Sequence, residues 1–191
     1  MTRMITLYHA PRSRSSRFVW LLEELETPYE LMHVTIRRRD GSGGPDPKNP
    51  HPDKKVPALL HDGELVTESA AIVLYLTDLF PAKQLGPLSG ERGRGAYLTW
   101  LAYYAGVMEP AIQLRAAGQP SPELEAMDRR IVSALEAAPY LVGGRFSGAD
   151  LLVASVAQWS RAALPKADVL DDYLARVTSR TGFKRALAKD G

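Results

Sequence analysis

The sequence predicts a small α/β domain followed by an all-α domain, on the basis of three observations. Strand-like and helix-like apolar patterns alternate through the first part of the chain. A segment rich in Pro and Gly, FPAKQLGPLSGERG, then interrupts them. Every apolar pattern after this segment has helical spacing. We therefore predict one domain at 1–80, a linker at 81–90 and an all-α domain at 91–191.

The first domain has the predicted element order β-α-β-loop-β-β-α. The predicted strands are 4–8, 29–34, 56–60 and 64–67, and the predicted helices are 14–25 and 68–80. The helix at 68–80 is apolar on nearly every side, so we expect it to be buried. Residues 36–55 are rich in Gly, Pro and charge and predict a long irregular loop. Such a loop is uncommon inside a compact domain and is often functional.

The second domain consists of predicted helical segments only. They are 95–117, 121–138, 146–164, 168–180 and 181–189. Ser147 and Asp150 have the spacing of a capping box, with Asp in place of the usual Glu or Gln. We interpret this pair as the structural start of a core helix, so Asp150 is not a candidate catalytic acid.

Composition sets limits on the class of protein. The chain has 191 residues, of which 45% are apolar and 24% charged, which is typical of a soluble globular protein. Its net charge of +2 is too small to argue for binding to nucleic acid or to an anionic membrane. No apolar run is long enough for a membrane-spanning helix, and the N-terminus lacks the apolar core of a signal peptide. We therefore expect a cytoplasmic location.

The absence of cysteine excludes several kinds of chemistry. With no Cys in the chain, disulfides, thiolate metal sites, Cys nucleophiles and CxxC redox motifs are all ruled out. The four histidines are scattered at positions 9, 33, 51 and 61, and no pair has the spacing of metal ligands. We expect no metal site.

The stretch KKVPALLHDGELVTESAA, residues 54–71, contains two features suited to a peptide ligand. Pro57 cannot donate to a β-ladder, and a cis bond before it would turn the N–H and C=O of Val56 outward to pair with an extended peptide. Glu68 and Ser69 begin a helix, whose unpaired N–H groups suit a carboxylate, while the Glu68 side chain suits an ammonium group. A short peptide with a carboxylate and an α-amine at one end matches both. The alternative is purely structural: Pro57 starts a strand, and Thr67 or Ser69 caps a helix.

The same stretch resembles the glutathione-binding signature of the glutathione transferase family. The similarity covers essentially the whole chain and is most specific at 54–76. It implies a thioredoxin-like N-terminal domain, an all-helical C-terminal domain and a cis bond before Pro57. It also implies that the Val56 backbone pairs with the cysteinyl part of glutathione and that Glu68 and Ser69 bind its γ-glutamyl end. The residue before the Val, here Lys55, would contact the glycyl end, with Lys54 and His51 as weaker candidates.

A second motif, LYHAPRSRSSRFVW at 7–20, resembles the family's serine-using classes. The spacing of Ser13 from Tyr8 and Arg17 is theta-like and indicates Ser13 as the hydroxyl that donates to the glutathione sulfur, with Ser15 as the second candidate. A free thiol has a pKa of about 8.5, so a hydroxyl donor and a helix N-terminus would both favour the nucleophilic thiolate. Without the resemblance, the residues favour interpreting Ser13 as a helix cap.

The resemblance also implies the activity and the partners. It implies a homodimer that conjugates glutathione, as co-substrate, to a hydrophobic electrophile in a detoxification reaction. Tyr103, Tyr104 and Val107 lie on the helix that borders the electrophile pocket in the family, although an aromatic stripe at helical spacing is also typical of plain core. Two alternatives remain: a glutathione-dependent reductase, isomerase or dehalogenase, and a non-catalytic protein that uses this fold for binding or regulation.

Overall fold

The computed structural model describes residues 4–190, which form two compact units. Among the described residues, unit 1 comprises 4–73 and 181–190, and unit 2 comprises Leu74–Arg180. The predicted fold class is confirmed, because a thioredoxin-like sheet with helices precedes a helical region. The division between the units falls within one helix and groups the last helix with the sheet. The domain boundaries 1–80 and 91–191 stay a prediction.

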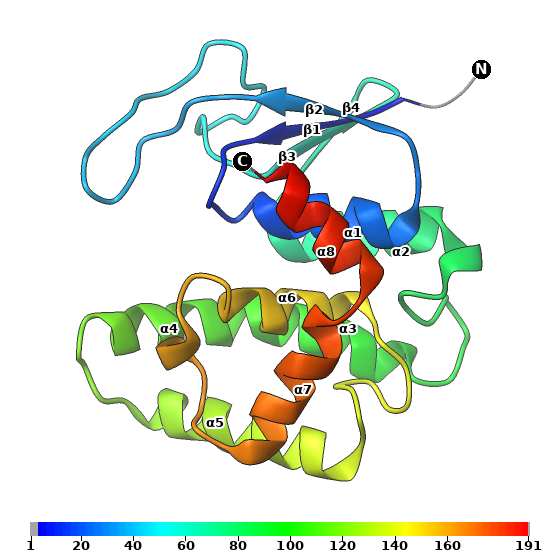
Figure 1. The fold of residues 1–191 in the computed structure, drawn as a ribbon, viewed down its shortest axis with the longest axis vertical. Helices are drawn as coiled ribbons and strands as arrows, with labels where there is room; N and C mark the ends of the chain where they lie inside the picture. Colours follow the sequence, from blue (N-terminus) through cyan, green and yellow to red (C-terminus); the bar gives the residue numbers. More distant parts are fainter. Residues whose placement is uncertain (1–3, 191) are drawn as a thin grey trace. The chain divides into compact units, whose positions relative to one another are not determined.

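Unit 1 is built on a four-stranded mixed sheet (Figure 1). Its strands are β1 (Ile5–His9), β2 (Tyr29–His33), β3 (Ala58–His61) and β4 (Glu64–Thr67). Their order in the sheet is β2-β1-β3-β4, with β1 parallel to β2 and antiparallel to β3. The central strand β1 is almost entirely buried, whereas the edge strand β2 is partly exposed. The parallel pair requires a crossover, which the helix α1 (Ser16–Leu25) supplies.

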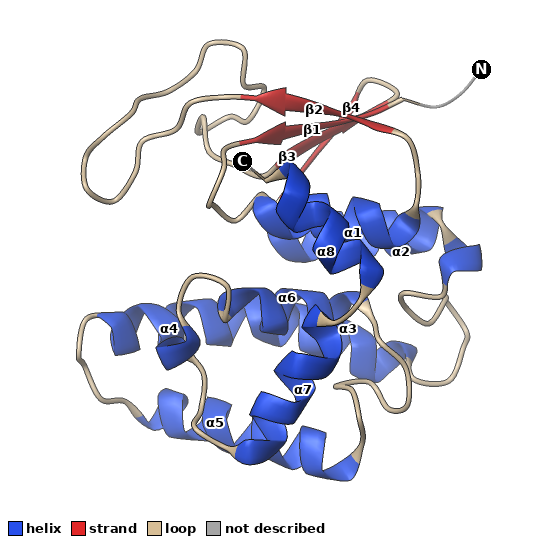
Figure 2. Cartoon of the chain, in the orientation of Figure 1, coloured by secondary structure: helices blue, strands red, loops and turns tan. Residues whose placement is uncertain are grey.

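Two helices from opposite ends of the chain, α1 and α8 (Thr181–Lys189), pack together beside this sheet (Figures 1 and 2). The rings of Trp20 and Phe183 meet edge to face, with centroids 4.9 Å apart. The buried carboxylate of Glu23 accepts hydrogen bonds from Arg185 and Lys189 of α8. Apolar packing and charge-assisted hydrogen bonds therefore fasten the end of the chain to α1.

The predicted irregular loop is present: residues 34–57 contain neither helix nor strand. Its fold depends on side chains that bind its own backbone. The carboxylate of Asp46 accepts from the N–H groups of Thr35 and Lys48, at 3.2 and 2.9 Å. The buried Asn49 donates to the carbonyl of Lys55 at 2.9 Å. These local hydrogen bonds substitute for a regular ladder and hold the segment that leads to Pro57.

The helix α2 (Ser69–Leu79) follows the hairpin of β3 and β4. Ile72, Val73 and Leu76 form a fully buried seam along it. The expected burial is confirmed, since Ala71 and Asp78 are its exposed residues.

The regular elements of unit 2 are all helices, joined by loops, one of which contains an isolated bridge between Tyr140 and Gly143. No helix in residues 4–190 is long and apolar enough to cross a membrane. The helices of unit 2 are α3 (Arg94–Tyr103), α4 (Glu109–Ala116), α5 (Pro122–Ala137), α6 (Gly148–Val156) and α7 (Asp168–Thr178), with 3₁₀ turns at Pro81–Lys83 and Arg161–Ala163. All of α6 is buried. The predicted capping box of Ser147 and Asp150 is present at its start.

The helix predicted at 95–117 is interrupted by a π-helical turn, Tyr104–Met108, between α3 and α4. The physical reason is Pro110, the second residue of α4. Proline has no N–H to donate to the carbonyl four residues earlier, and its ring would clash with that carbonyl in a regular α-helix. Widening the preceding turn removes both conflicts.

Asp150 is the centre of a buried polar cluster in unit 2. Its carboxylate accepts from the N–H of Leu141 at 2.9 Å, from the N–H and Oγ of Ser147 at 2.8 Å each, and from the Tyr173 hydroxyl at 3.1 Å. Burial raises the pKa of Asp150, and these hydrogen bonds oppose that rise. The cluster ties a loop, the start of α6 and α7 together, which supports its interpretation as structural.

Candidate functional site: a serine loop beside a cis-proline

The candidate site in unit 1 begins at the loop between β1 and α1, residues 10–15. Ser15 is fully buried at the end of this loop. Its Oγ lies 2.8 Å from His9 Nδ1, 2.8 Å from Ser13 Oγ, and accepts from the N–H of Ala10 at 3.1 Å. A contact of 3.3 Å to the carbonyl of Ala10 is longer. The Ser15 hydroxyl is therefore fully engaged inside the protein.

Ser13 lies two residues before Ser15 and is half-buried. Its Oγ accepts from the N–H of Ser15 at 3.1 Å, and its carbonyl accepts from the N–H of Ser16, the first residue of α1, at 3.1 Å. Ser13 thus supports the start of α1 and also reaches the surface. Ser13 and Ser15, the two candidates from the sequence, are in direct contact with each other.

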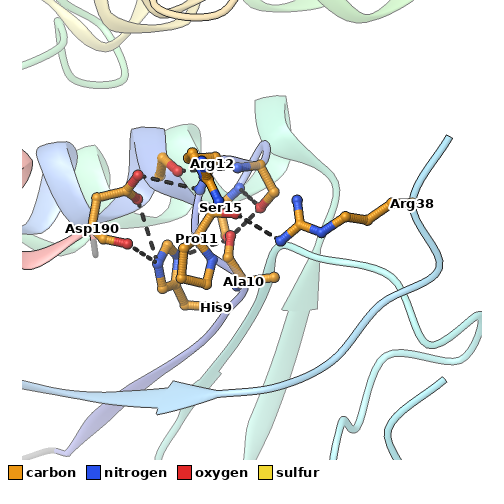
Figure 3. Close-up of polar contacts among 9 residues, drawn as sticks. His9, Ala10, Pro11, Arg12, Ser15, Arg38 and Asp190 are labelled. Atoms are coloured by element: carbon orange, nitrogen blue, oxygen red, sulfur yellow. Dashed lines mark hydrogen bonds and ion pairs between the residues drawn. The ribbon is translucent and has the colours of Figure 1, made fainter. Parts of the chain in front are cut away.

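His9 and Asp190 were not selected as site residues from the sequence, yet they complete this cluster (Figure 3). His9 is fully buried, and its Nε2 lies 3.4 Å from Oδ1 and 3.5 Å from the carbonyl of Asp190. Burial lowers the pKa of His9 below 6.5, and the Asp190 carboxylate opposes that shift. A histidine directly before a serine-rich loop was a usable signal. Asp190 lies 181 positions away and gave none.

The loop is also held from outside. The N–H of Arg12 donates to Asp190 Oδ2 at 3.3 Å, and Arg38 donates to the carbonyl of Pro11 at 3.0 Å (Figure 3). Arg12 adopts a positive φ of 54°. Residues other than glycine adopt this conformation at a cost, and such strain is concentrated at functional sites.

The predicted cis bond between Val56 and Pro57 is confirmed. Val56 is 8% exposed and packs in one apolar cluster with Ala10 and Val34, so the cis-proline lies beside the serine loop. Within the described residues, no hydrogen bond to the backbone N–H or C=O of Val56 is found. These two groups are suited to pairing with an extended ligand.

The hairpin of β3 and β4 brings Glu68 and Ser69 close to the cis-proline. Ala58, which follows Pro57, pairs with Thr67, which precedes Glu68. The Glu68 side chain is exposed, its φ is 67°, and its carbonyl accepts from the N–H of Ile72 at 2.9 Å. Ser69, the first residue of α2, is 9% exposed. Glu68 is thus a second strained residue at the candidate site.

The basic residues before Val56 differ in how they are engaged. The Lys55 side chain is 72% exposed and lies 3.3 Å from the Asp53 carboxylate. Lys54, with a φ of 54°, donates to the carbonyl of Asn49 at 2.6 Å. His51 is buried, and its Nδ1 accepts from the N–H of Asp53 at 3.0 Å. Lys55 is therefore the most accessible of the three.

The predicted electrophile-pocket residues all lie in unit 2. Tyr103 is half-buried, packs edge to face on Trp100 at 5.9 Å and has the Arg130 guanidinium 4.0 Å from its ring centroid. Tyr104 is buried and donates to Glu109 at 3.0 Å. Val107 lies half-buried in the π-helical turn. Irregular turns of this kind are frequent at functional sites. In residues 4–190, no group of three or more His, Cys, Asp or Glu side chains is placed to hold a metal ion.

A thioredoxin-like sheet, a cis-proline before its third strand and a helical second region define a class of protein, and comparisons with known proteins identify the family. Residues 3–78 match the family model "Glutathione S-transferase, N-terminal domain". The chain is 27% identical to glutathione S-transferase GstA of Escherichia coli O157:H7 over 97% of this chain and 98% of that one.

Solved structures agree with this match. A glutathione transferase from Methylococcus capsulatus is 28% identical, covers 98% of both chains and superimposes with a TM-score of 0.80. A sphingomonad glutathione S-transferase, solved in complex with glutathione, is 26% identical and has a TM-score of 0.78 over 97% of this chain and 98% of that one. Residues 3–78 therefore match the N-terminal domain of the glutathione S-transferase family, and the whole chain is similar in sequence and fold to glutathione S-transferases.

Proposed function

We propose that the protein binds glutathione in unit 1, ionises its thiol and transfers it to an electrophilic small molecule. One observation carries the proposal: the cis bond at Val56 and Pro57 lies between the serine loop and Glu68 in one unit. A γ-glutamyl tripeptide offers an extended backbone, a thiol and a charged amino-acid end. These match an unpaired backbone, a half-buried hydroxyl and a carboxylate beside a helix N-terminus.

The roles of the binding residues follow from their chemistry. The N–H and C=O of Val56 pair with the cysteinyl residue of glutathione, as a short piece of β-ladder. The exposed carboxylate of Glu68 binds the γ-glutamyl ammonium group, and the N-terminus of α2 at Ser69 binds the carboxylate. The Lys55 ammonium group leaves the Asp53 carboxylate and pairs with the glycyl carboxylate of glutathione.

Within the serine loop, the structure favours Ser13 over Ser15 as the group that touches sulfur. Ser15 is fully buried and its hydroxyl is engaged on three sides, whereas Ser13 is half-buried. A hydrogen bond from the Ser13 hydroxyl to sulfur stabilises the thiolate over the thiol and so lowers the pKa of bound glutathione. This is the serine-using, theta-like form of the site.

Other parts of the proposal concern partners. Tyr103, Tyr104 and Val107 contribute to the pocket for a hydrophobic electrophile, and the protein works as a cytoplasmic homodimer. The named relatives support a transferase of the glutathione S-transferase family. The reductase, isomerase or dehalogenase alternative uses the same thiolate with a different second substrate. The non-catalytic alternative predicts that no thiolate forms.

The test is a titration of glutathione followed by ultraviolet absorbance, which distinguishes thiolate from thiol. We expect the wild type to give a saturable thiolate signal at neutral pH. Ser13→Ala should still bind glutathione but lose about tenfold of the thiolate, corresponding to a pKa about one unit higher. Ser133→Ala, on the exposed face of α5, is the matched control and should behave as the wild type.

Two further measurements complete the test. Turnover of an activated aryl halide should fall in Ser13→Ala in parallel with the thiolate signal. Light scattering should give twice the mass of one chain. A wild type that binds no glutathione, by absorbance and by calorimetry, would refute the proposal. Thiolate without turnover of any aryl halide would instead favour the reductase, isomerase or dehalogenase.

A further inference from the structure

The polar cluster behind Ser13 is a continuous chain of hydrogen-bonding groups. The Oγ of the half-buried Ser13 lies 2.8 Å from the Oγ of Ser15, and the Oγ of Ser15 lies 2.8 Å from Nδ1 of His9. The other ring nitrogen of His9 faces Asp190. His9 and Ser15 are both fully buried, so the middle of this chain is shielded from water, while its two ends, Ser13 and Asp190, are partly exposed.

The partners of His9 determine which ring nitrogen carries the proton. Nε2 faces the carboxylate and the carbonyl of Asp190, and both groups can only accept hydrogen bonds. Nε2 is therefore protonated. Burial lowers the pKa of His9 and keeps the resting ring neutral, so its Nδ1 is an acceptor. Ser15 then donates its single hydroxyl proton to His9 Nδ1 at 2.8 Å, in preference to the carbonyl of Ala10 at 3.3 Å.

This assignment orients the remaining protons. Ser15 Oγ accepts the N–H of Ala10 and donates to His9, so its contact with Ser13 requires Ser13 to be the donor. In the resting protein, the Ser13 proton therefore points to Ser15 and away from the ligand. Ser13 then accepts a hydrogen bond from a bound thiol, and every hydrogen bond in the chain points toward His9.

We propose that Ser13, Ser15 and His9 form a relay that moves the proton of bound glutathione to His9. The S–H bond breaks as its proton passes to Ser13 Oγ, the Ser13 proton passes to Ser15 Oγ, and the Ser15 proton passes to His9 Nδ1. The sulfur keeps the electron pair as a thiolate, and His9 becomes an imidazolium ion facing the Asp190 carboxylate. This inference rests on the proposed function.

The relay explains how Ser13 becomes a donor to sulfur. After the transfer every hydrogen bond is reversed: His9 donates to Ser15, Ser15 to Ser13, and Ser13 to the thiolate. Ser13 is the catalytic residue that touches the ligand, while Ser15 and His9 act through it. Two titratable groups face His9 among the described residues. Asp190, after α8, favours the imidazolium ion, and His33 on β2, with its ring 5.4 Å away, opposes it.

The decisive measurement is the number of protons released when glutathione binds. Calorimetric titrations of the full chain, in two buffers of different ionisation enthalpy, give this number, and ultraviolet absorbance gives the thiolate formed. With the relay, the wild type forms thiolate at neutral pH without releasing a matching proton, because His9 retains it. Without the relay, each thiolate is accompanied by one proton released to the buffer.

Three variants test the individual steps. Ser15→Ala and His9→Gln should keep glutathione binding but lower the thiolate at neutral pH by about tenfold, and the thiolate that remains should release its proton. Asp190→Asn, at the chain end, removes the charge that stabilises the imidazolium ion and should shift the pH profile of thiolate formation upward. Ser133→Ala, on the exposed face of α5, is the matched control and should keep the wild-type proton count.

The outcomes separate the two proposals. Thiolate in the wild type with full proton release, or a proton count unchanged in Asp190→Asn and His9→Gln, would overturn the relay and leave the proposed function intact. Absence of thiolate in the wild type would overturn both. Asp190→Asn keeps the test valid if substitutions at the buried positions prevent folding, because the Asp190 side chain is 19% exposed.

Discussion

Each unit contains a polar cluster that includes an aspartate, and the two clusters are built differently. In unit 2, the fully buried carboxylate of Asp150 accepts hydrogen bonds from Leu141, Ser147 and Tyr173. In unit 1, the fully buried His9 and Ser15 link the partly exposed Asp190 to the partly exposed Ser13.

The difference shows how a structural polar cluster can be distinguished from a functional one. The Asp150 cluster joins elements together, and its hydrogen bonds are directed inward. The cluster at His9 extends from fully buried residues to the partly exposed Ser13, and Arg12, with its positive φ, is the residue before Ser13. A cluster whose hydrogen bonds are all internal, such as that at Asp150, contributes stability. A cluster that reaches the surface, such as that at His9, can exchange a proton with a ligand.

Removing the Asp150 carboxylate should have the largest effect on stability. Asp150→Ala leaves two N–H groups and the Ser147 hydroxyl buried without an acceptor, while Tyr173 keeps the backbone carbonyl of residue 150. We therefore expect the free energy of unfolding to fall by about 3–5 kcal/mol. Urea unfolding measures it, with the exposed Asp172→Ala as control, expected within about 0.5 kcal/mol of the wild type. A loss below about 1 kcal/mol would show that the cluster is not a structural centre.

Weakening the attachment of α8 should have an intermediate effect, because α8 leads directly to Asp190. Burial by itself raises the pKa of Glu23, but hydrogen bonds from Lys189, Tyr29 and Arg185 outweigh it and hold the pKa below its usual value. Glu23→Gln keeps the shape but removes the charge, so we expect a loss of about 2 kcal/mol at neutral pH.

The sign of the pH dependence makes this prediction specific. A carboxylate with a lowered pKa in the folded state stabilises the protein above its unfolded pKa, about 4.3, and this contribution is lost as pH falls through the folded pKa. The stability difference between wild type and Glu23→Gln should therefore be full at neutral pH and vanish in acid. Urea unfolding at several pH values measures it. A difference independent of pH would contradict the charge argument, and the exposed Glu136→Gln is the control.

The smallest expected effect on stability is a gain rather than a loss, and it concerns Glu68. Glu68 adopts a φ of 67°, a conformation that glycine tolerates and other residues adopt at a cost. Glu68→Gly should stabilise the protein by about 1 kcal/mol and weaken glutathione binding, measured by urea unfolding and calorimetry. Glu68→Ala, the matched control, should weaken binding without the gain in stability. A loss of stability in Glu68→Gly would mean that Glu68 is retained for structure and not for a ligand.

Most of the fold was predictable because it depends on local patterns. The strands and helices of the first domain lie within one or two residues of their predicted positions, since alternation, helical spacing and turn residues act over a few neighbours. The π-helical turn was missed although Pro110 signals a break, because the surrounding apolar pattern stays helical across it.

The candidate site was predictable only in part. The Val-Pro step and the Glu-Ser pair are contiguous motifs, and the cis bond follows the family resemblance. The proposed choice of Ser13 over Ser15 rests on burial, and the proposed role of His9 rests on the distance between its ring and Ser15. Neither quantity is encoded in a short stretch of sequence.

The amino-acid pattern was sufficient to predict the element order, the family resemblance and a candidate ligand-binding segment, because each depends on residues that are neighbours in the chain. The tertiary fold was required to bring Asp190 to His9, and the proton arrangement that we propose between His9 and Ser13 depends on it. The reason is physical. The packing of α8 on α1 closes a contact over 181 residues, and hydrogen-bond direction depends on which acceptor lies within reach in three dimensions.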